Sequence, residues 1–445
     1  MTSKTNAKTI RTLENLTFAF MPYIRRALNT TASVAPKYRS RGTPSEQKQI
    51  DIAIGAIEGV SRISHMTHRY SPIQRKIYHN QATYSKYLKK PAFRSTRCGH
   101  SDKQQDAMMP WFKVYQLSPV RLLQQSNFQF ILPYVEHRSV IAVIDLSTLT
   151  VWSKRFEHAT RGYGIPVKQW GYQLASLYLK LDDATGLWSY MKLAPGNETS
   201  QRLFETLINE LNQQREIGAF HVKVVLMDAG FASKEHFLML DHLSYKFVSA
   251  VPRHDYLENL EFKPVYEVRR KNKIRQYAEA YFYLDGVKLK VIRSTTIHRG
   301  KKGKEKKRET HFFVSNLVEM EARKIMKLYD ERWSIENNLF KELKSGCRIR
   351  IPSKKFISTV IYLLMVQLGF NIYQMAMRAM RDYGMANIRG ITSFQQLVCK
   401  VALIALEILS SLLTLKPPGV WTRNEVLLEL SRELQRKLMK VMWSE

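Results

Sequence analysis

The spacing of apolar residues changes along the chain and divides it into parts of different structure. The first 130 residues carry apolar positions at helical spacing, such as Leu13, Leu16 and Phe20, with basic residues between them. This spacing predicts amphipathic helices. From about residue 135, continuous and alternating apolar runs indicate strands, which we expect at 138–147, 171–180, 187–193, 222–227 and 245–251. Helices are expected between these strands at 197–216 and 233–242.

Residues 254–310 interrupt this alternation of strands and helices. Strands are expected at 265–274, 277–284 and 287–292, and Asp285-Gly286 between the last two is a strong hairpin signal. A further strand is expected at 311–316. Helical spacing then continues toward the end of the chain, at 319–344, 355–383, 391–415 and 424–442.

One stretch, residues 356–377, is apolar enough to be compared with a membrane span. Gln367, Asn371 and Gln374 interrupt it, and such polar side chains are costly in lipid. A helix buried in the protein core explains the pattern better. The first eleven residues are polar and basic and lack the apolar segment of a secretory signal. We therefore expect a cytoplasmic protein.

The net charge of the chain limits the class of partner that it can be expected to bind. The chain of 445 residues holds 70 Lys and Arg against 38 Asp and Glu, a formal charge of +32. Such an excess repels itself in the folded state, so it makes sense if the partner is a polyanion, with nucleic acid first and an anionic membrane surface second. The length predicts two to four domains. The three widely spaced cysteines exclude a disulfide framework.

Three acidic residues stand where they could converge. Asp145 and Asp228 each follow an apolar run that reads as a buried strand, and the end of such a strand lies at the rim of a sheet, where ligands bind. On the helix at 319–344, Tyr329, Arg332 and Glu336 are spaced i, i+3 and i+7 and share one face. Two strand-end carboxylates and one helix carboxylate can hold two Mg²⁺ ions. The alternative for Glu336 and Arg332 is an ordinary surface ion pair.

This arrangement resembles a family. The order Asp145, Asp228, Glu336, with Asp-x-Gly-Phe from Asp228 and Tyr-x-x-Arg-x-x-x-Glu from Tyr329, is similar to the bacterial insertion-sequence DDE transposases of the insertion-sequence-four superfamily, with their Tyr-Arg-Glu-Lys signature. The resemblance covers residues 135–380. It departs at the lysine, which falls seven residues after the glutamate in the family, whereas position 343 here is Leu. The nearest lysines are Lys341 and Lys344, and we assign the role to Lys344.

The resemblance implies an α/β fold with a ribonuclease H-like catalytic core. Asp145, Asp228 and Glu336 would be its catalytic residues and would hold two Mg²⁺ ions, for which Mn²⁺ could substitute. The implied domains are a helical basic DNA-binding region, the core in two segments, a β-rich insertion and a helical C-terminal region, at residues 1–130, 135–253 with 311–383, 254–310 and 384–445.

The implied activity is that of a Mg²⁺-dependent DNA transposase. It would bind the terminal inverted repeats of its element, cleave the DNA ends and join them to target DNA, as a homodimer associated with the bacterial nucleoid. Tyr329, Arg332 and Lys344 would contact phosphate near the cut. Two alternatives remain: a ribonuclease H-like nuclease that does not integrate, and a catalytically inactive DNA-binding protein derived from a transposase.

A dense basic run occupies residues 299–308. It contains seven basic residues and one acid. Like charges at this density repel unless phosphates neutralise them, so we interpret the run as a phosphate clamp, with a solvated loop tip as the alternative. The residues assigned to DNA contact here are Lys301, Lys302, Lys304, Lys306, Lys307 and Arg308. A second region, residues 70–97, interleaves basic residues with tyrosines and is also predicted to contact DNA.

Overall fold

The described part of the protein is built on one sheet of nine strands in the order β3-β2-β1-β4-β5-β9-β8-β7-β6. The computed structural model describes residues 110–162, 164–182, 185–270, 273–299, 305–335, 351 and 353–382. The predictions for the first 109 residues and for the last 63, from residue 383 on, lie outside these ranges. So do those for Glu336, Lys344, Lys301, Lys302 and Lys304.

The first five strands lie at the positions along the chain that the apolar runs predict. Strand β1 pairs antiparallel with β2, and β2 pairs antiparallel with β3. Strand β4 pairs parallel with β1, and β5 pairs parallel with β4. The bounds are β1 Ser139–Val151, β2 Trp170–Lys180, β3 Gly186–Pro195, β4 His221–Met227 and β5 Phe247–Val251. Most of their side chains are buried, which explains why their sequences read as continuous apolar runs rather than as strict alternation.

The remaining four strands continue the same sheet. Strand β9 (Glu305–Ser315) pairs with β5. Beyond it the sheet continues with β8 (Val287–Arg299), β7 (Lys273–Leu284) and β6 (Lys263–Arg270), and each of these strands is antiparallel to its neighbour. The single strand predicted at 265–274 is wrong, because β6 ends at Arg270 and β7 begins at Lys273. The hairpin at Asp285-Gly286 is confirmed: Leu284 pairs with Val287, and Asp285 and Gly286 both have positive φ, as a tight turn between strands needs.

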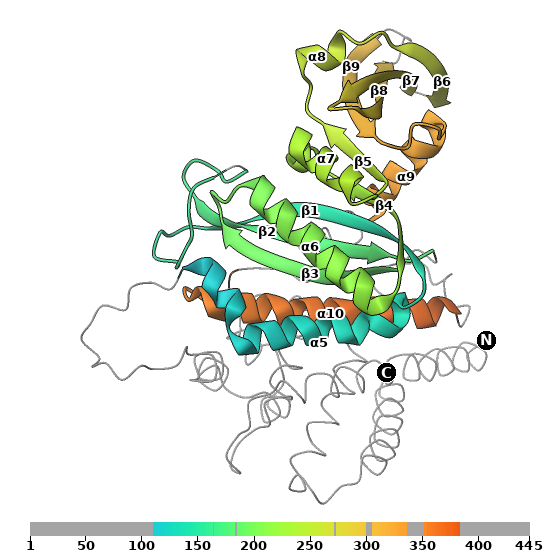
Figure 1. Cartoon of the computed structure of the whole chain (residues 1–445). Helices are drawn as coiled ribbons and strands as arrows, with labels where there is room; N and C mark the ends of the chain where they lie inside the picture. Colours follow the sequence, from blue (N-terminus) through green and yellow to red (C-terminus); the bar gives the residue numbers. More distant parts are fainter. Residues whose placement is uncertain are drawn as a thin grey trace, which may run out of the picture.

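Helices cover both faces of β1–β3 (Figure 1). Helix α5 (Ser118–Val135) and helix α10 (Phe356–Asp382) lie side by side on one face, and α6 (Ser200–Gly218) crosses the other. Helix α6 begins where the Thr199 side chain accepts a hydrogen bond from the Arg202 N–H, and α7 (Lys234–His242) begins where Ser233 caps His236 in the same way. The short helices are η2 Trp111–Gln116, η3 Ala229–Phe231 and α8 Asp255–Glu258.

The boundary predicted at residue 130 falls inside α5. This helix packs against α10 and β3, so residues 118–135 lie against the sheet. The Tyr115 hydroxyl also donates to the Leu193 carbonyl of β3 (3.0 Å) and accepts from the Leu193 N–H (2.7 Å). The sheet and its helical cover thus begin upstream of the change in apolar spacing.

The polar residues of α10 are used inside the protein. The Asn371 amide donates to the Trp188 carbonyl (2.9 Å) and its oxygen accepts from the Trp188 N–H (2.8 Å). Gln367 also donates to the Trp188 carbonyl (2.8 Å), while Asn127 of α5 donates to Gln367 (3.0 Å). These bonds satisfy the backbone N–H and carbonyl of Trp188 in β3, which is an edge strand of the described sheet. Among the described helices, none is both long and apolar enough to cross a membrane.

Candidate active site

Asp145 and Asp228 are brought together by the register of two parallel strands. Ile144 of β1 is aligned with Met227 of β4, so the next residues, Asp145 and Asp228, lie beside each other where β4 ends. Asp228 has left the strand and is the N-cap residue of the 3-10 helix η3. Two carboxylates from different segments therefore meet at one edge of the paired strands.

Asp145 itself is not at the end of its strand, contrary to the prediction. Strand β1 continues through Val151 because it keeps its antiparallel pairing with β2 beyond the last residue that pairs with β4. The edge at which the two carboxylates meet is created by the end of the shorter strand β4. The same pairing places Ser176 of β2 opposite Asp145.

Arg332 lies between the two aspartates. It belongs to α9 (Ala322–Ile335), which contacts β4, β5 and β7. One guanidinium nitrogen, Nη1, is 4.0 Å from an oxygen of Asp145, and the other, Nη2, is 3.6 Å from an oxygen of Asp228. The Arg332 and Asp145 side chains are 4% and 8% exposed, whereas Asp228 is 45% exposed. The pair of carboxylates thus opens to solvent on the Asp228 side and is closed by Arg332 on the other.

Two residues that the sequence interpretation missed interact with Asp145 or with the neighbour of Arg332. Lys180, at the end of β2, is buried and forms an ion pair with Glu331, the residue before Arg332. Tyr178, two residues earlier, is buried, and burial raises the pKa of its phenol; the negative charge of Asp145 adds to the rise. The only sequence signal for Lys180 is a single cation that closes an otherwise apolar run.

Tyr329 packs in the protein interior, and the described part of the basic run lies on or beside β9. Tyr329 is 3% exposed, and its ring packs edge-on against Phe313 at 4.7 Å. The Arg332 guanidinium carbon lies 5.1 Å from the centre of the Tyr329 ring. Both residues predicted to contact phosphate are thus buried here. In the basic run, Lys307 is exposed and pairs with Glu309 (2.5 Å), Arg308 is exposed, and Lys306 lies on β9.

The donor set suits a divalent metal ion of the Mg²⁺ type. Asp145 and Asp228 supply carboxylate oxygens, which are the ligands that Mg²⁺ prefers. Their two negative charges face one positive charge, that of Arg332, which leaves a net negative cluster. No group of three His, Cys, Asp or Glu side chains gathers within the described ranges, and Glu336 lies outside them.

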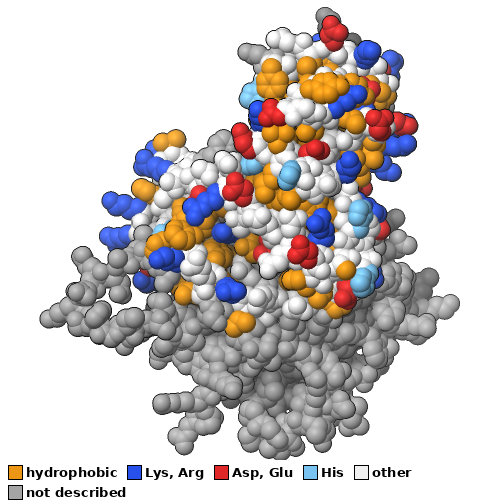
Figure 2. Space-filling model, in the orientation of Figure 1, with side chains coloured by type: hydrophobic (Ala, Val, Ile, Leu, Met, Phe, Trp, Pro, Cys, Tyr) orange, Lys and Arg blue, Asp and Glu red, His pale blue; other side chains and the backbone are white. Residues whose placement is uncertain are grey.

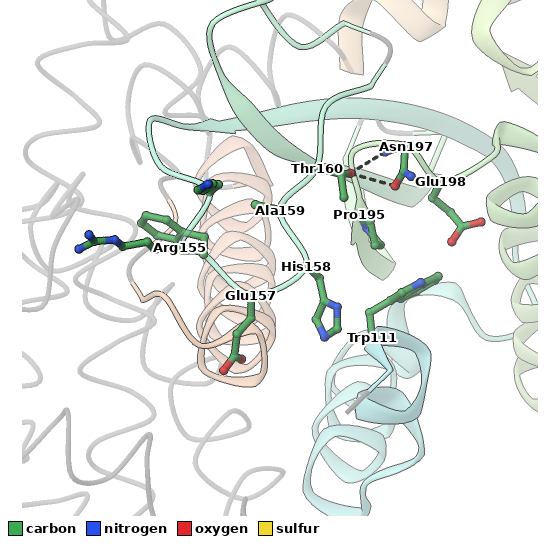
Figure 3. Close-up of a pocket in the computed structure, with 11 residues that line it drawn as sticks. Trp111, Arg155, Glu157, His158, Ala159, Thr160, Pro195, Asn197 and Glu198 are labelled. Atoms are coloured by element: carbon green, nitrogen blue, oxygen red, sulfur yellow. Dashed lines mark hydrogen bonds between the residues drawn. The ribbon is translucent and has the colours of Figure 1, made fainter. Parts of the chain in front are cut away.

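A separate hollow of about 630 Å³ lies in the loop that follows β1 (Figure 3). Its polar groups hold the loop together. Thr160 donates to the Asn197 side chain (2.9 Å), and Glu157 accepts from the Phe356 N–H at the start of α10 (2.9 Å) and pairs with Lys355 (2.6 Å). We therefore assign this hollow a structural role.

The fold and the carboxylate pair define an α/β protein with one acidic residue on a strand, a second just after the neighbouring parallel strand, and a third element, α9, that contacts both. Residues 136–372, just over half of the chain, match the family of the transposase DDE domain, so the chain belongs to that family. Among solved structures, a piggyBac transposase in a synaptic complex with hairpin DNA is similar at 13% identity and a TM-score of 0.48, over 95% of this chain and 85% of that one. A comparison with curated proteins gives no match.

Proposed function

We propose that the protein is a DNA transposase with a ribonuclease H-like core, which cleaves the ends of its element and joins them to target DNA. The observation that carries the proposal is the alignment of Asp145 with Asp228 at the end of β4, with Arg332 against both. The strand order β3-β2-β1-β4-β5, with the first three antiparallel and the last two parallel to β1, supports the assignment of the core.

In this proposal Asp145, Asp228 and Glu336 hold two Mg²⁺ ions, with Mn²⁺ as a substitute. When bound there, two such ions would supply activation of the attacking oxygen and charge stabilisation of the leaving one. The protein supplies the position of the carboxylates and excludes water from the Asp145 side, which is buried. Arg332 offers two N–H groups in a planar fork, the geometry that suits a phosphate as well as a carboxylate. The finer assignment, to the insertion-sequence-four superfamily, rests on Tyr329, Arg332 and Glu336.

The partner in this proposal is duplex DNA, comprising the terminal inverted repeats and a target site, bound by a homodimer near the nucleoid. The charge of +32 supports a polyanionic partner. Basic side chains stand at the β6–β9 end and around the loop after β1 (Figure 2). Tyr329 and Lys344 are proposed as phosphate contacts beside Arg332, and the run 299–308 as a clamp.

The test uses a labelled fragment that carries the DNA flanking the gene. Wild-type protein with Mg²⁺ should cleave at the junction, and Asp145→Asn, Asp228→Asn and Glu336→Gln should each abolish cleavage while binding persists. The control Asp182→Asn, at an exposed turn residue paired with Lys223, should cleave normally. Cleavage that survives in one of the three variants removes that residue from the site. Element ends joined to a target plasmid distinguish a transposase from a nuclease that does not integrate. A wild-type protein that binds the fragment without cutting it would instead be the catalytically inactive DNA-binding protein.

A further inference from the structure

A basic hollow lies on another part of the molecule, between the strands β6 and β7 and the helix α9. Its volume is about 520 Å³. Lys273 and Arg275 of β7 line one wall, and Arg323, Lys324 and Lys327 of α9 line the other. Two acids, Glu321 and Asp330, also reach it, so five cations face two anions. An excess of three positive charges in one concave site favours an anionic ligand.

The first turn of α9 strengthens this preference. Backbone N–H groups at a helix N-terminus carry a partial positive charge, so acidic residues are favoured there and cations are unfavourable. The first turn of α9 contains no acidic residue and holds Arg323 and Lys324 instead. Glu321, the residue before the helix, pairs with Lys324 (3.3 Å) and balances that cation, so a bound phosphate would act mainly on Arg323 and on the helix end.

The walls of the hollow are fixed by contacts within the protein. The Tyr266 and Tyr277 rings stack with centres 4.2 Å apart. The Arg275 guanidinium donates to the Tyr277 hydroxyl (3.3 Å) and to Thr296 (3.3 Å). The buried Lys290 of β8 donates to the Met320 carbonyl just before α9 (2.8 Å), which ties the start of the helix to the sheet. The cations are therefore presented by a site that the fold builds.

This hollow is distinct from the carboxylate pair. Arg323, Lys327 and Asp330 lie at i, i+4 and i+7 and share one face of α9. Arg332 follows Arg323 by nine residues, which at about 100° per residue puts it roughly 180° round the helix. Helix α9 therefore carries the basic hollow on one face and the contact with Asp145 and Asp228 on the other.

We propose that the basic hollow binds the phosphodiester backbone of duplex DNA, as a second contact separate from the carboxylate site. The proposal rests on the proposed function only in taking DNA as the partner. The ligand chemistry is a chain of phosphates rather than a single anion, because the cations are spread over two elements. DNA bound there would contact α9, the same helix that places Arg332 beside Asp145 and Asp228.

The experiment compares two charge-matched variants of the full chain. Arg323→Gln/Lys324→Gln/Lys327→Gln removes three cations of the hollow, and Arg138→Gln/Lys223→Gln/Lys246→Gln removes three exposed cations elsewhere. Binding to a labelled duplex of mixed sequence is measured over a range of salt concentrations. The slope of log affinity against log salt should fall by about 0.9 for each phosphate that is no longer neutralised, hence by roughly two to three in the first variant and little in the second.

The first variant should also unfold close to the wild-type temperature without DNA, because it changes only exposed side chains and removes one surface ion pair, Lys324 with Glu321. Lys273→Gln/Lys327→Gln, which takes one cation from each wall, should lower the slope as well. Equal salt slopes in the hollow variant and the control variant would overturn the proposal. So would displacement of the duplex by inorganic phosphate at the same total phosphate charge, or a fall in slope that is seen with duplex RNA but not with duplex DNA. Cleavage of the element end by the wild type is assayed on the same preparation, so failure of the proposed function is seen separately.

Discussion

The guanidinium of Arg332 lies 4.0 Å from a carboxylate oxygen of Asp145, and neither side chain is more than 8% exposed. Two opposite charges on different elements, α9 and β1, are thus removed from water together. Each makes the burial of the other tolerable, because an uncompensated buried charge is costly. The contact also fixes the rotation of α9 relative to the edge of β1 and β4.

Arg332→Leu should therefore destabilise the protein strongly. Loss of one partner of a buried ion pair typically costs about 3–5 kcal/mol, and here Asp145 would stay buried without its cation. The free energy of unfolding is measured with urea. Addition of Mg²⁺ should restore more stability to Arg332→Leu than to the wild type, because a metal ion replaces the missing positive charge.

Two further variants separate charge from geometry. Arg332→Lys keeps the charge but not the planar fork, so it should remain folded and cleave DNA less efficiently. Lys327→Leu removes an exposed cation from the same helix and should change stability by less than about 0.5 kcal/mol. If Arg332→Leu and the wild type had the same urea midpoint of unfolding, the ion pair between Arg332 and Asp145 would not contribute to stability.

The basic run at 299–308 should contribute to DNA affinity through charge. Replacing Lys301, Lys302, Lys304, Lys306 and Lys307 by Gln should flatten the slope of log affinity against log salt by about 0.9 for each phosphate contact. Lys307 already pairs with Glu309 at 2.5 Å, so its own share should be smaller than that of the others. Restoring Lys307 alone gives the measure of that share. A slope equal to that of the wild type would make the run a solvated loop.

Asn371→Leu should destabilise the layer between α10 and β3. The substitution removes the partner of the Trp188 N–H, and the Trp188 carbonyl keeps only Gln367. A buried donor left unsatisfied costs about 1–3 kcal/mol, and we expect a loss in that range by urea denaturation. Gln213→Leu, at an exposed position on α6, serves as the matched control and should be close to neutral. An unchanged stability in Asn371→Leu would mean that water replaces the amide.

Much of the fold follows from periodicity because periodicity reports burial. Strands β1 to β5 and helices α6, α7 and α10 lie where apolar spacing predicts them, within a few residues. The division between β6 and β7 was missed, because the end of β6 at Arg270 and the start of β7 at Lys273 fall within one largely basic stretch of sequence. The helical cover from α5 was also placed outside the core, because apolar residues at helical spacing look alike whether the helix packs on this sheet or lies elsewhere.

The candidate site was predicted only in part. Asp145 and Asp228 could be chosen because each interrupts an apolar run, but the depth of Asp145 within β1 depends on where β4 ends, which is a tertiary property. Arg332 could be placed on a helix face, and its predicted partners were Glu336 and a phosphate. Spacing along a helix does not reveal what lies opposite, and the contacts with Asp145 and Asp228 come from another part of the chain.

His236 supports the segment that follows Asp228. Its ring stacks on Phe204 at 4.0 Å, and its Nδ1 donates to the Phe231 carbonyl (2.7 Å), at the end of the 3-10 helix that Asp228 begins. The residue is 2% exposed, and the other ring nitrogen is buried without a partner. Burial lowers the pKa of His236 below its usual value, and the bond to Phe231 offsets this only in part.

A histidine with a lowered pKa in the folded state makes stability depend on acidity in one direction. Above about pH 6.5 the ring is neutral in both states and costs nothing. As the pH falls below that value, the unfolded chain binds a proton that the folded chain does not, so the free energy of unfolding drops by up to about 1.4 kcal/mol for each pH unit until the folded ring is protonated as well.

His236→Phe should keep the stacking on Phe204, lose the bond to Phe231 and remove this acid dependence. The measurement is the free energy of unfolding between pH 7.5 and 5, with His221→Phe, at an exposed position, as the control that should retain the wild-type slope. If His236→Phe and the wild type lost stability in parallel on acidification, another group would be responsible. The Phe231 N–H donates to the Asp228 carbonyl (3.0 Å) and so closes the turn after Asp228. Loss of the His236 bond to Phe231 in His236→Phe should therefore also loosen this turn, seen as a smaller Mg²⁺-induced stabilisation than in the wild type at pH 7.5.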